Sequence, residues 1–231
     1  MVFALILAGG TGSRMGNIEK PKQYLLLGEK PILIHSIEKY LSVDEFAHIT
    51  VSTPKEWISY TEKVIEKYLG KIDKISVIEG GDTRNDTLMM AIDFIDKKFG
   101  IDDDTIIATH DAVRPFVTKE VIEKSIVSAR EYGASNTVIP ATDTIVESKE
   151  GQFIDCIPNR STLYHGQTPQ SFNAKKLLRI YATLSDEEKI SLTDGCMIFT
   201  AKGEPVHLVL GDKTNIKITY PSDIKLAEQL L

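Results

Sequence analysis

A glycine-rich run near the start of the sequence, LAGGTGSRMG at positions 7–16, has the composition of an anion-binding loop. It follows an apolar segment, Val2 to Leu7, that is typical of a buried parallel strand. Glycines beyond the carboxyl end of a strand let backbone amides approach an anion, and Arg14 and Lys22 add positive charge. The glycine spacing fits neither GxxxxGK[ST] nor GxGxxG, which disfavours Walker-type ATPases and dinucleotide dehydrogenases. A glycine-rich turn with two solvated bases is the alternative.

A second candidate group, THDAVRP at positions 109–115, follows another predicted strand. Asp111 is the candidate metal ligand, because Mg²⁺ takes one or two carboxylates together with phosphate oxygens and water. Arg114 is a candidate for orienting that carboxylate or for binding an acceptor phosphate. A purely structural salt bridge is the alternative for this pair.

Two weaker signals complete the candidate chemistry. The segment GGDTRNDT at positions 80–87 precedes a predicted helix, where main-chain groups and the Thr87 hydroxyl could hold a base or a ribose. A plain helix N-terminus is the alternative. Arg160 and Lys217 are candidates for additional phosphate ligands, although exposed basic residues are more often simply solvated.

The order of the predicted elements indicates how these residues could meet. Hydrophobic periodicity predicts strands and helices in alternation, and Thr118 is a candidate N-cap for the fourth helix. The strands are expected at 2–7, 48–52, 74–79 and 105–110, and the helices at 32–41, 57–69, 84–98 and after Thr118. This alternation predicts an α/β fold, Rossmann-like, with a mostly parallel sheet flanked by helices. Ligands of such sheets bind at the carboxyl ends of the strands, where the candidate residues lie.

The pattern changes in the second half of the chain. Three strand-like segments, at 137–141, 143–148 and 153–157, predict a protruding β-arm at about 141–163. Ser185 to Glu188 matches a capping box and predicts a short helix. Strands near 206–210 and 215–219 and a helix from about Pro221 are expected to complete a single domain, 1–231.

Composition bounds the possible partners and compartment. The 231 residues carry 27 basic and 33 acidic side chains, and the basic residues are scattered, so no nucleic-acid or membrane-binding surface is expected. The apolar stretches are too short to span a bilayer and nothing resembles a signal peptide, so we expect a cytoplasmic protein. The two cysteines and five dispersed histidines indicate neither a disulfide framework nor a zinc site.

With these residues laid out, the sequence resembles the cytidylyltransferases that make CDP-methylerythritol or CDP-ribitol. The resemblance spans nearly the whole chain and rests on the segments LAGGTGSRMG, PKQ, GG-x-x-R, HDAVRP, DTI, QTPQSF, TD and NIKIT, in that order. It implies a homodimer with interlocked arms that uses CTP, Mg²⁺ and a polyol-phosphate acceptor. The implied reaction is in-line attack of an acceptor phosphate oxygen on the α-phosphorus of CTP, with release of pyrophosphate.

The resemblance also implies roles for individual residues. The positions that match catalytic phosphate ligands are Arg14, Lys22 and Lys217. Those that match the nucleotide site are Leu7, Ala8, Gly9, Gly10, Gly81, Asp82, Thr87, Asp111 and Ala112, and Asp111 also matches the metal contact. Those that match acceptor ligands are Arg114, Thr193 and, from the other subunit, Thr144 and Arg160.

Several details favour D-ribitol 5-phosphate over 2-C-methyl-D-erythritol 4-phosphate as the acceptor. The segments DTIVES and IPNR resemble the ribitol branch, whereas the methylerythritol branch more often has a basic residue at Val146 and a tryptophan at Tyr164. Two features depart from the ribitol pattern, His165 and the segment GCM at 195–197. We therefore expect CDP-ribitol synthesis for teichoic acid or another surface polymer, with methylerythritol phosphate as the alternative acceptor.

Two other classes of protein are alternatives to this one. A non-catalytic nucleotide-binding module would keep the fold, but Arg14, Lys22 and Asp111 speak against it. A sugar-nucleotide glycosyltransferase could share an α/β core. Its DxD motif is matched only by Asp102 to Asp104, which precede a predicted strand instead of following it.

Overall fold

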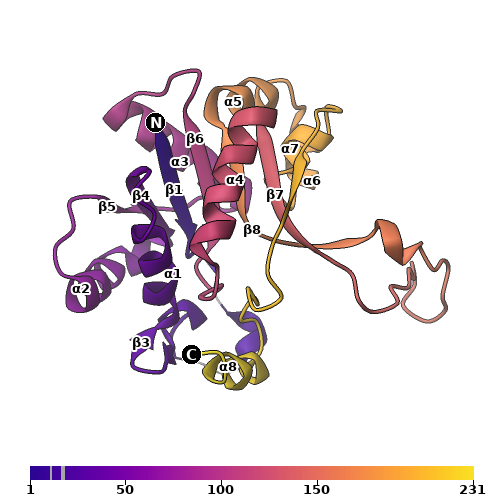
Figure 1. The fold of residues 1–231 in the computed structure, drawn as a ribbon, viewed down its shortest axis with the longest axis horizontal. Coiled ribbons are helices and arrows are strands. Elements are labelled where there is room, and N and C mark those ends of the chain that lie inside the picture. Colours follow the sequence, from indigo (N-terminus) through magenta and orange to yellow (C-terminus); the bar gives the residue numbers. More distant parts are fainter. Residues whose placement is uncertain (11, 17–18) are drawn as a thin grey trace.

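The computed structural model describes residues 1–10, 12–16 and 19–231, which form a seven-stranded sheet with helices on both faces (Figure 1). The strand order is β5-β4-β1-β6-β8-β7-β9, and a short hairpin, β2 (Leu26–Leu27) and β3 (Lys30–Pro31), lies apart from it. The expected α/β fold with a mostly parallel sheet is therefore confirmed.

The first half of the sheet is parallel throughout. β1 (Val2–Leu7) lies between β4 (Phe46–Thr53) and β6 (Ile106–Asp111), and β5 (Ile75–Glu79) forms the edge beyond β4. The carboxyl ends of these strands therefore meet at one edge of the sheet, which is the edge that the glycine-rich run enters.

One strand of the second half reverses direction. β8 (Tyr164–Asn173) is antiparallel to both of its neighbours, β6 and β7 (Ala134–Pro140), whereas β9 (His207–Leu210) is parallel to β7. The sequence pattern did not predict β8, because four of its residues that are buried in the structure are polar: Gln167, Thr168, Gln170 and Ser171. Their side chains make hydrogen bonds in the interior, so polarity here did not indicate a loop.

The helices cover the two faces of the sheet. Their bounds are α1 (Ile32–Leu41), α2 (Ile58–Leu69), α3 (Arg84–Phe99), α4 (Lys119–Tyr132), α5 (Ala174–Tyr181), α6 (Asp186–Ser191), α7 (Met197–Thr200) and α8 (Pro221–Glu228). Side chains of α1, α2 and α4 pack in one apolar cluster, and those of α3, α5 and α7 pack in another. None of the helices in the described part of the chain has the length and apolar character needed to cross a membrane.

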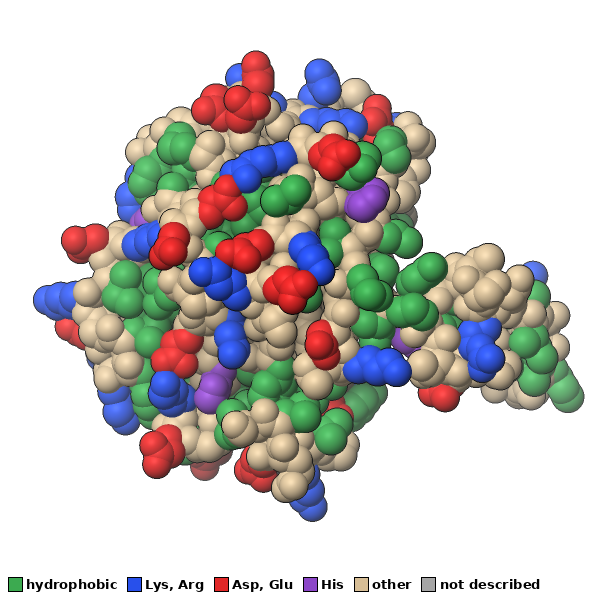
Figure 2. All heavy atoms as spheres, in the orientation of Figure 1, with side chains coloured by type: hydrophobic (Ala, Val, Ile, Leu, Met, Phe, Trp, Pro, Cys, Tyr) green, Lys and Arg blue, Asp and Glu red, His purple; other side chains and the backbone are tan. Residues whose placement is uncertain are grey.

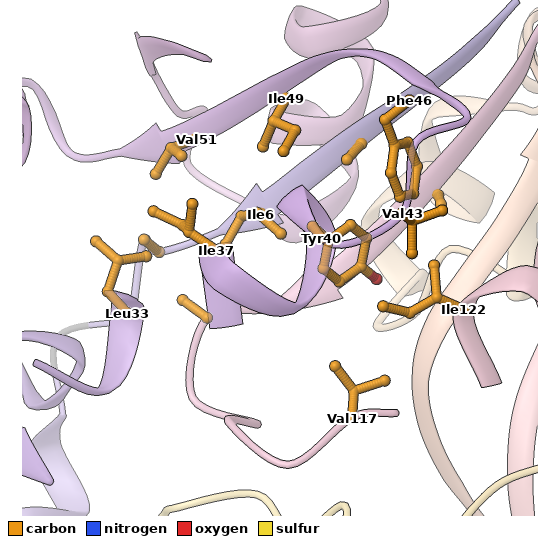
Figure 3. Close-up of a cluster of buried hydrophobic side chains, with 14 of the residues drawn as sticks. Ile6, Leu33, Ile37, Tyr40, Val43, Phe46, Ile49, Val51, Val117 and Ile122 are labelled. Atoms are coloured by element: carbon orange, nitrogen blue, oxygen red, sulfur yellow. The ribbon is translucent and has the colours of Figure 1, made fainter. Parts of the chain in front are cut away.

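Alternation along β1 separates the two clusters. Ala4 and Ile6 point into the first, together with Ile37 and Tyr40 of α1 (Figure 3), whereas Phe3 and Leu5 point into the second. All six side chains are fully buried. Burial of a large apolar side chain contributes about 1.5–3 kcal/mol relative to exposure, so both faces of β1 hold it rigidly beneath the loop that follows.

Helix starts agree with the sequence. The Thr118 hydroxyl accepts a hydrogen bond from the amide of Val121 at the start of α4, and Ser185 and Glu188 form the predicted capping box of α6. α3 starts with a capping box that was not predicted, between Thr83 and Asp86. This box fixes the first turn of α3, which faces the cavity described below.

Two sets of predicted strands are wrong. Residues 143–148 and 153–157 form no ladder beyond one isolated bridge between Glu147 and Cys156, because a two-stranded ribbon without a packed face is only marginally stable. Residues 215–219 are not a strand either. This segment crosses the end of the sheet and is fixed by single contacts, such as the bond from the Ile218 amide to the Val113 carbonyl.

The connection between β7 and β8, residues 141–163, extends away from the body of the molecule (Figure 1). It contains a short 3₁₀ turn, Arg160–Thr162. Its position matches the predicted arm, although its two sides are irregular instead of strand-like.

Candidate active site

A cavity of about 280 Å³ opens at the carboxyl ends of β1 and β6. It brings together every residue predicted for the nucleotide site and for catalytic phosphate contact. The predicted residues on its lining are Leu7, Ala8, Gly9, Gly10, Arg14, Lys22, Gly81, Asp82, Thr87, Asp111, Ala112 and Lys217. Thr11, in the middle of the glycine-rich run, lies outside the described residues.

The glycines on this lining have two different physical roles. A Cβ atom at Gly9 or Gly10 would meet nothing within 4 Å, so packing within the protein does not require glycine there. A Cβ atom at Gly81 would lie 2.5 Å from Cβ of Asp86, so this glycine lets the loop pack on the first turn of α3. Gly9 and Gly10 therefore leave open space where a ligand can approach the backbone.

Two cationic side chains, Arg14 and Lys22, line the cavity and differ in their exposure to solvent. Lys22 is buried, and its pKa is lowered by burial and by the neighbouring charges of Lys217 and Arg14. Arg14 is exposed, and its guanidinium carbon lies 5.9 Å from the centre of the Tyr220 ring. Positive charges held this close together repel one another, so the cavity is suited to a polyanion such as a triphosphate.

Asp111, the last residue of β6, is the acidic centre of the site. Its Oδ1 lies 2.6 Å from Arg84 Nη1, and its Oδ2 lies 3.0 Å from Lys217 Nζ and 3.4 Å from Arg114 Nε. Burial alone would raise the pKa of Asp111, but these three cations outweigh burial and hold the pKa well below its usual range. The carboxylate is therefore ionised at neutral pH.

A second cavity of about 150 Å³ adjoins the first and shares Arg84, Asp111 and Lys217 with it. Two predicted acceptor ligands, Arg114 and Thr193, lie on its lining. The remainder of the lining is polar and consists of Gly166, Gln167, Thr168, Gln170 and Asp194. The Asp111 carboxylate thus stands between two cavities that lie side by side.

The other two predicted acceptor ligands are elsewhere. Thr144 and Arg160 lie exposed on the arm, and Arg160 donates a hydrogen bond to the Thr142 carbonyl at 2.9 Å. Neither residue lines the two cavities of this chain. A contribution from the arm of a second subunit therefore stays a prediction.

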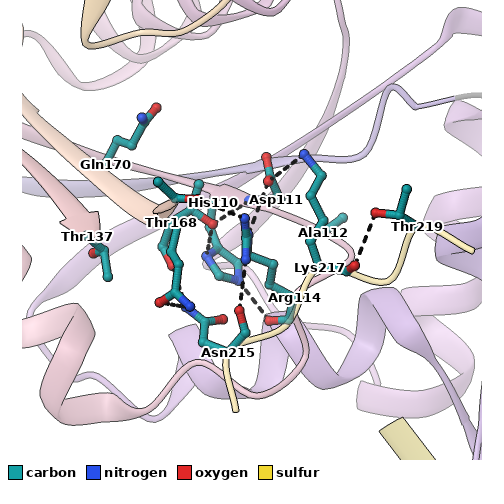
Figure 4. Close-up of polar contacts among 12 residues, drawn as sticks. His110, Asp111, Ala112, Arg114, Thr137, Thr168, Gln170, Asn215, Lys217 and Thr219 are labelled. Carbon is teal, nitrogen blue, oxygen red and sulfur yellow. Dashed lines mark hydrogen bonds and ion pairs between the residues drawn. The ribbon is translucent and has the colours of Figure 1, made fainter. Parts of the chain in front are cut away.

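A buried network of hydrogen bonds holds Asp111 and Arg114 in position (Figure 4). His110 Nε2 donates to the Arg114 carbonyl, and Nδ1 is paired with the Thr168 hydroxyl, which in turn accepts from the Asp111 amide. The Arg114 guanidinium donates to the Asn215 carbonyl at 2.8 Å. Burial lowers the pKa of His110 to about 4, so the ring is neutral and Nδ1 accepts from Thr168.

Three site residues that contact one another had no role predicted from the sequence: Arg84, Gln170 and Asp194. Each is present within a motif of the family, in GG-x-x-R, QTPQSF and TD respectively. The position of Arg84 after two glycines, at a predicted helix start, was the available signal. For Gln170 and Asp194 only the fold reveals their proximity, because they lie on β8 and on the loop between α6 and α7.

The acidic side chains limit how a metal ion could bind. In the described part of the chain, no three His, Cys, Asp or Glu side chains gather into a metal site. Asp111 lines the larger cavity, and a single carboxylate with phosphate oxygens and water is a donor set that Mg²⁺ accepts, so Asp111 as its ligand stays a prediction.

The parallel sheet, the glycine-rich loop after β1 and the adjoining cationic cavities define the class, a nucleotidyltransferase with an α/β fold. The family can then be stated. A model of the IspD family, 2-C-methyl-D-erythritol 4-phosphate cytidylyltransferase, matches residues 2–231, so the chain belongs to this family of CTP-dependent cytidylyltransferases.

Solved structures agree with this assignment. The 4-diphosphocytidyl-2C-methyl-D-erythritol synthase from Anaerococcus prevotii is 28% identical, with a TM-score of 0.79 over 100% of this chain and 95% of that chain. The 2-C-methyl-D-erythritol 4-phosphate cytidylyltransferase from Francisella tularensis is 25% identical, with a TM-score of 0.79 over 100% and 99%. The enzyme of the same name from Thermus thermophilus, 24% identical with a TM-score of 0.75 over 100% and 98%, supports the fold alone.

Proposed function

We propose that this cytidylyltransferase transfers CMP from CTP to D-ribitol 5-phosphate and releases pyrophosphate. The observation that carries the reaction is the pair of adjoining cavities with Arg84, Asp111 and Lys217 on their shared lining. The larger cavity has the positive charge that a nucleoside triphosphate needs, and the smaller one is lined by the polar groups that suit a phosphorylated polyol. The two phosphates would therefore meet beside Lys217.

The chemistry needs no covalent intermediate with the protein. An oxygen of the acceptor phosphate attacks the α-phosphorus of CTP, a new P–O bond forms, and the bond to the β-phosphate oxygen breaks as pyrophosphate leaves. Arg14, Lys22 and Lys217 place positive charge where negative charge accumulates, and the two cavities align the reactants. A bound Mg²⁺ would neutralise triphosphate charge, with Asp111 as its protein ligand.

Two candidate acceptors are supported by different observations. The segments DTIVES and IPNR, with Val146 and Tyr164 in place of a basic residue and a tryptophan, favour ribitol 5-phosphate. The family and the similar structures are named for methylerythritol phosphate, and these names favour the second acceptor over the first. We retain ribitol 5-phosphate as the proposal because Val146 and Tyr164 belong to the arm and its return, from which acceptor ligands are expected.

The arm supports a dimeric assembly. Four apolar side chains on it are at least 49% exposed, Val146, Phe153, Ile154 and Ile157, and Figure 2 shows apolar surface on this projection. Apolar groups at this density are unusual on a free surface. We propose a homodimer in which the arms interlock and Thr144 and Arg160 reach the acceptor cavity of the partner. We further propose a cytoplasmic location and a supply of CDP-ribitol for teichoic acid or another surface polymer.

One experiment tests the reaction and the acceptor together. Pyrophosphate release is measured with CTP and Mg²⁺, with ribitol 5-phosphate and methylerythritol 4-phosphate as parallel acceptors. A higher kcat/KM for ribitol 5-phosphate supports the proposal, and a higher value for methylerythritol 4-phosphate transfers the function to isoprenoid precursor synthesis. Binding of CTP without turnover of either acceptor would indicate the non-catalytic module.

A further inference from the structure

The smaller cavity contains one carboxylate that the proposed reaction leaves without a role. Asp194 lies between α6 and α7, is partly buried and lines this cavity together with Lys217 and Arg84. Among the ion pairs of residues 1–10, 12–16 and 19–231, none includes Asp194, whereas Asp111 has three cationic partners. The Asp194 charge is therefore not neutralised by a direct cationic contact.

Asp194 is held in position by a buried amide. Gln170, which is 2% exposed, donates from Nε2 to both oxygens of the Asp194 carboxylate, at 2.9 and 2.8 Å. Its Oε1 accepts from Arg84 Nη2 at 3.3 Å. Because arginine only donates and a carboxylate only accepts, these two neighbours fix the orientation of the amide. Gln170 thus connects the cation on the shared lining to the carboxylate.

The carboxylate has acceptor capacity left. Oδ1 receives hydrogen bonds from Gln170 and from the Cys196 amide, and Oδ2 receives one from Gln170. The buried Cys196 thiol, a weak donor, also bonds to this carboxylate. An ionised carboxylate has about four lone-pair sites in total. The negative charge of Asp194 repels a phosphate, which the cations of the same cavity can bind. The remaining lone-pair site of Asp194 therefore suits a neutral donor such as a hydroxyl group.

We infer that Asp194, held by Gln170, is a specificity-determining residue that accepts a hydrogen bond from a hydroxyl group of the acceptor's polyol chain. The inference rests on the proposed function and deepens it, because it orients the acceptor: its phosphate lies at the cations shared with the nucleotide cavity, and a hydroxyl lies at Asp194. An acceptor without this hydroxyl leaves one lone-pair site of the carboxylate desolvated and without a donor, so the site discriminates against it.

The first test compares two isosteric substitutions. Asp194→Asn keeps the shape of the side chain and removes its charge. Asp212→Asn is the control, because the Asp212 carboxylate accepts hydrogen bonds only from Thr214 among the described residues and lies outside both cavities. We expect Asp194→Asn to lower kcat/KM for ribitol 5-phosphate by about tenfold or more, with the KM for CTP changed by less than about twofold. Asp212→Asn should match the unmodified protein. An equal rise in both KM values overturns the inference.

The second test uses acceptors that each lack one hydroxyl group. For one of the deoxyribitol 5-phosphates, the unmodified protein should have a much lower kcat/KM than for ribitol 5-phosphate. In Asp194→Asn the ratio of these two kcat/KM values should be smaller by at least about tenfold. Discrimination that is unchanged by the substitution overturns the inference. If the Asp194→Asn variant does not fold, Asp194→Glu, which keeps the charge but moves it, replaces it in this test.

These experiments separate the inference from the proposed function. If the unmodified protein turns over neither ribitol 5-phosphate nor methylerythritol 4-phosphate, both are overturned. If it turns over either one, the deoxy series is made from that acceptor. Turnover without coupling between Asp194 and a hydroxyl group then overturns the inference alone.

Discussion

Arg84 Nη1 lies 2.6 Å from Asp111 Oδ1, and this ion pair joins the first turn of α3 to the last residue of β6. Arg84 also donates to Gln170 of β8, so one guanidinium contacts side chains from two strands at the centre of the site. Lys217, from the segment before α8, approaches the same Asp111 carboxylate. The distances between these side chains are therefore maintained by charged contacts as well as by the sheet.

Substitution of Arg84 should impair the site more than the fold. Arg84→Met removes both contacts and leaves the Asp111 carboxylate with two cations, so we expect kcat/KM to fall by about 10²-fold. Arg84→Lys can keep the contact to Asp111 but cannot also donate to Gln170, so it should recover only part of the activity. Steady-state kinetics with both substrates measure this order. Full activity of Arg84→Lys would contradict a role that needs contacts to both Asp111 and Gln170.

Lys22→Ala should lower turnover far more than stability. The ammonium group lies on the lining of the larger cavity and is buried, and loss of one catalytic charge typically costs about 10²–10³ in kcat. Lys20→Ala is the matched control, because Lys20 is exposed and binds the Tyr60 hydroxyl away from the cavity. Circular dichroism confirms folding. If Lys22→Ala is inactive because it is unfolded, the catalytic interpretation is lost.

The two kinds of glycine should respond differently to the same substitution. Gly9→Ala meets no atom of the protein, so we expect little change in the free energy of unfolding but weaker CTP binding. Gly81→Ala would place its Cβ 2.5 Å from Asp86 Cβ and should destabilise the protein by about 1–3 kcal/mol. Urea unfolding and CTP titration distinguish them. Equal loss of stability in both variants would refute the distinction.

Mild acid should destabilise the protein through His48. Burial, together with Lys98 and Lys74, lowers the pKa of His48 to about 4, below the value of about 6.5 expected in an unfolded chain. Between these values the unfolded state binds more protons, so the free energy of unfolding falls as the pH decreases from about 6.5 to 4. His48→Gln removes this contribution and should reduce the slope in urea unfolding series at several pH values, and the part that remains includes the contribution of His110, whose pKa burial also lowers to about 4. An unchanged slope would exclude His48 as a source.

The arm should control the oligomeric state. Phe153 and Ile154 are 78% and 60% exposed in the single chain, so a dimer that buries them should dissociate in the double variant Phe153→Asp, Ile154→Asp. Light scattering should give twice the chain mass of 25.7 kDa for the unmodified protein and the single mass for the variant. The control is Leu226→Asp, an equally drastic change at an exposed site on α8. A monomeric unmodified protein would count against the interlocked arms.

The sequence predicted best those elements whose packing follows one simple period. The bounds of β1 and α1 agree residue for residue with the expected segments, because a continuous apolar run and a helical stripe both pack against a uniform apolar layer. The same simplicity explains the success at helix starts, where a single side chain and a local amide determine the cap.

Prediction failed where non-local partners decide the structure. β8 is buried through polar side chains whose partners lie on β6, β7 and α4, so no local period revealed it. Residues 143–148 and 153–157 alternate like strands but lack a packed face in the single chain. Within the site, the glycine-rich loop and Asp111 were identifiable from motifs, whereas Gln170 and Asp194 gain their significance only through a contact made 24 positions apart.

The reversed direction of β8 has a consequence for how enzymes of this kind can diverge. The chain leaves the arm at the first residues of β8 and, within the same strand, reaches Gly166, Thr168 and Gln170 on the lining of the smaller cavity. A register shift of β8 against β6 and β7 would move the return of the arm together with the groups that line the smaller cavity. Selection for a new acceptor and selection for a new subunit contact thus act on one inherited segment, so the two traits should change together in evolution.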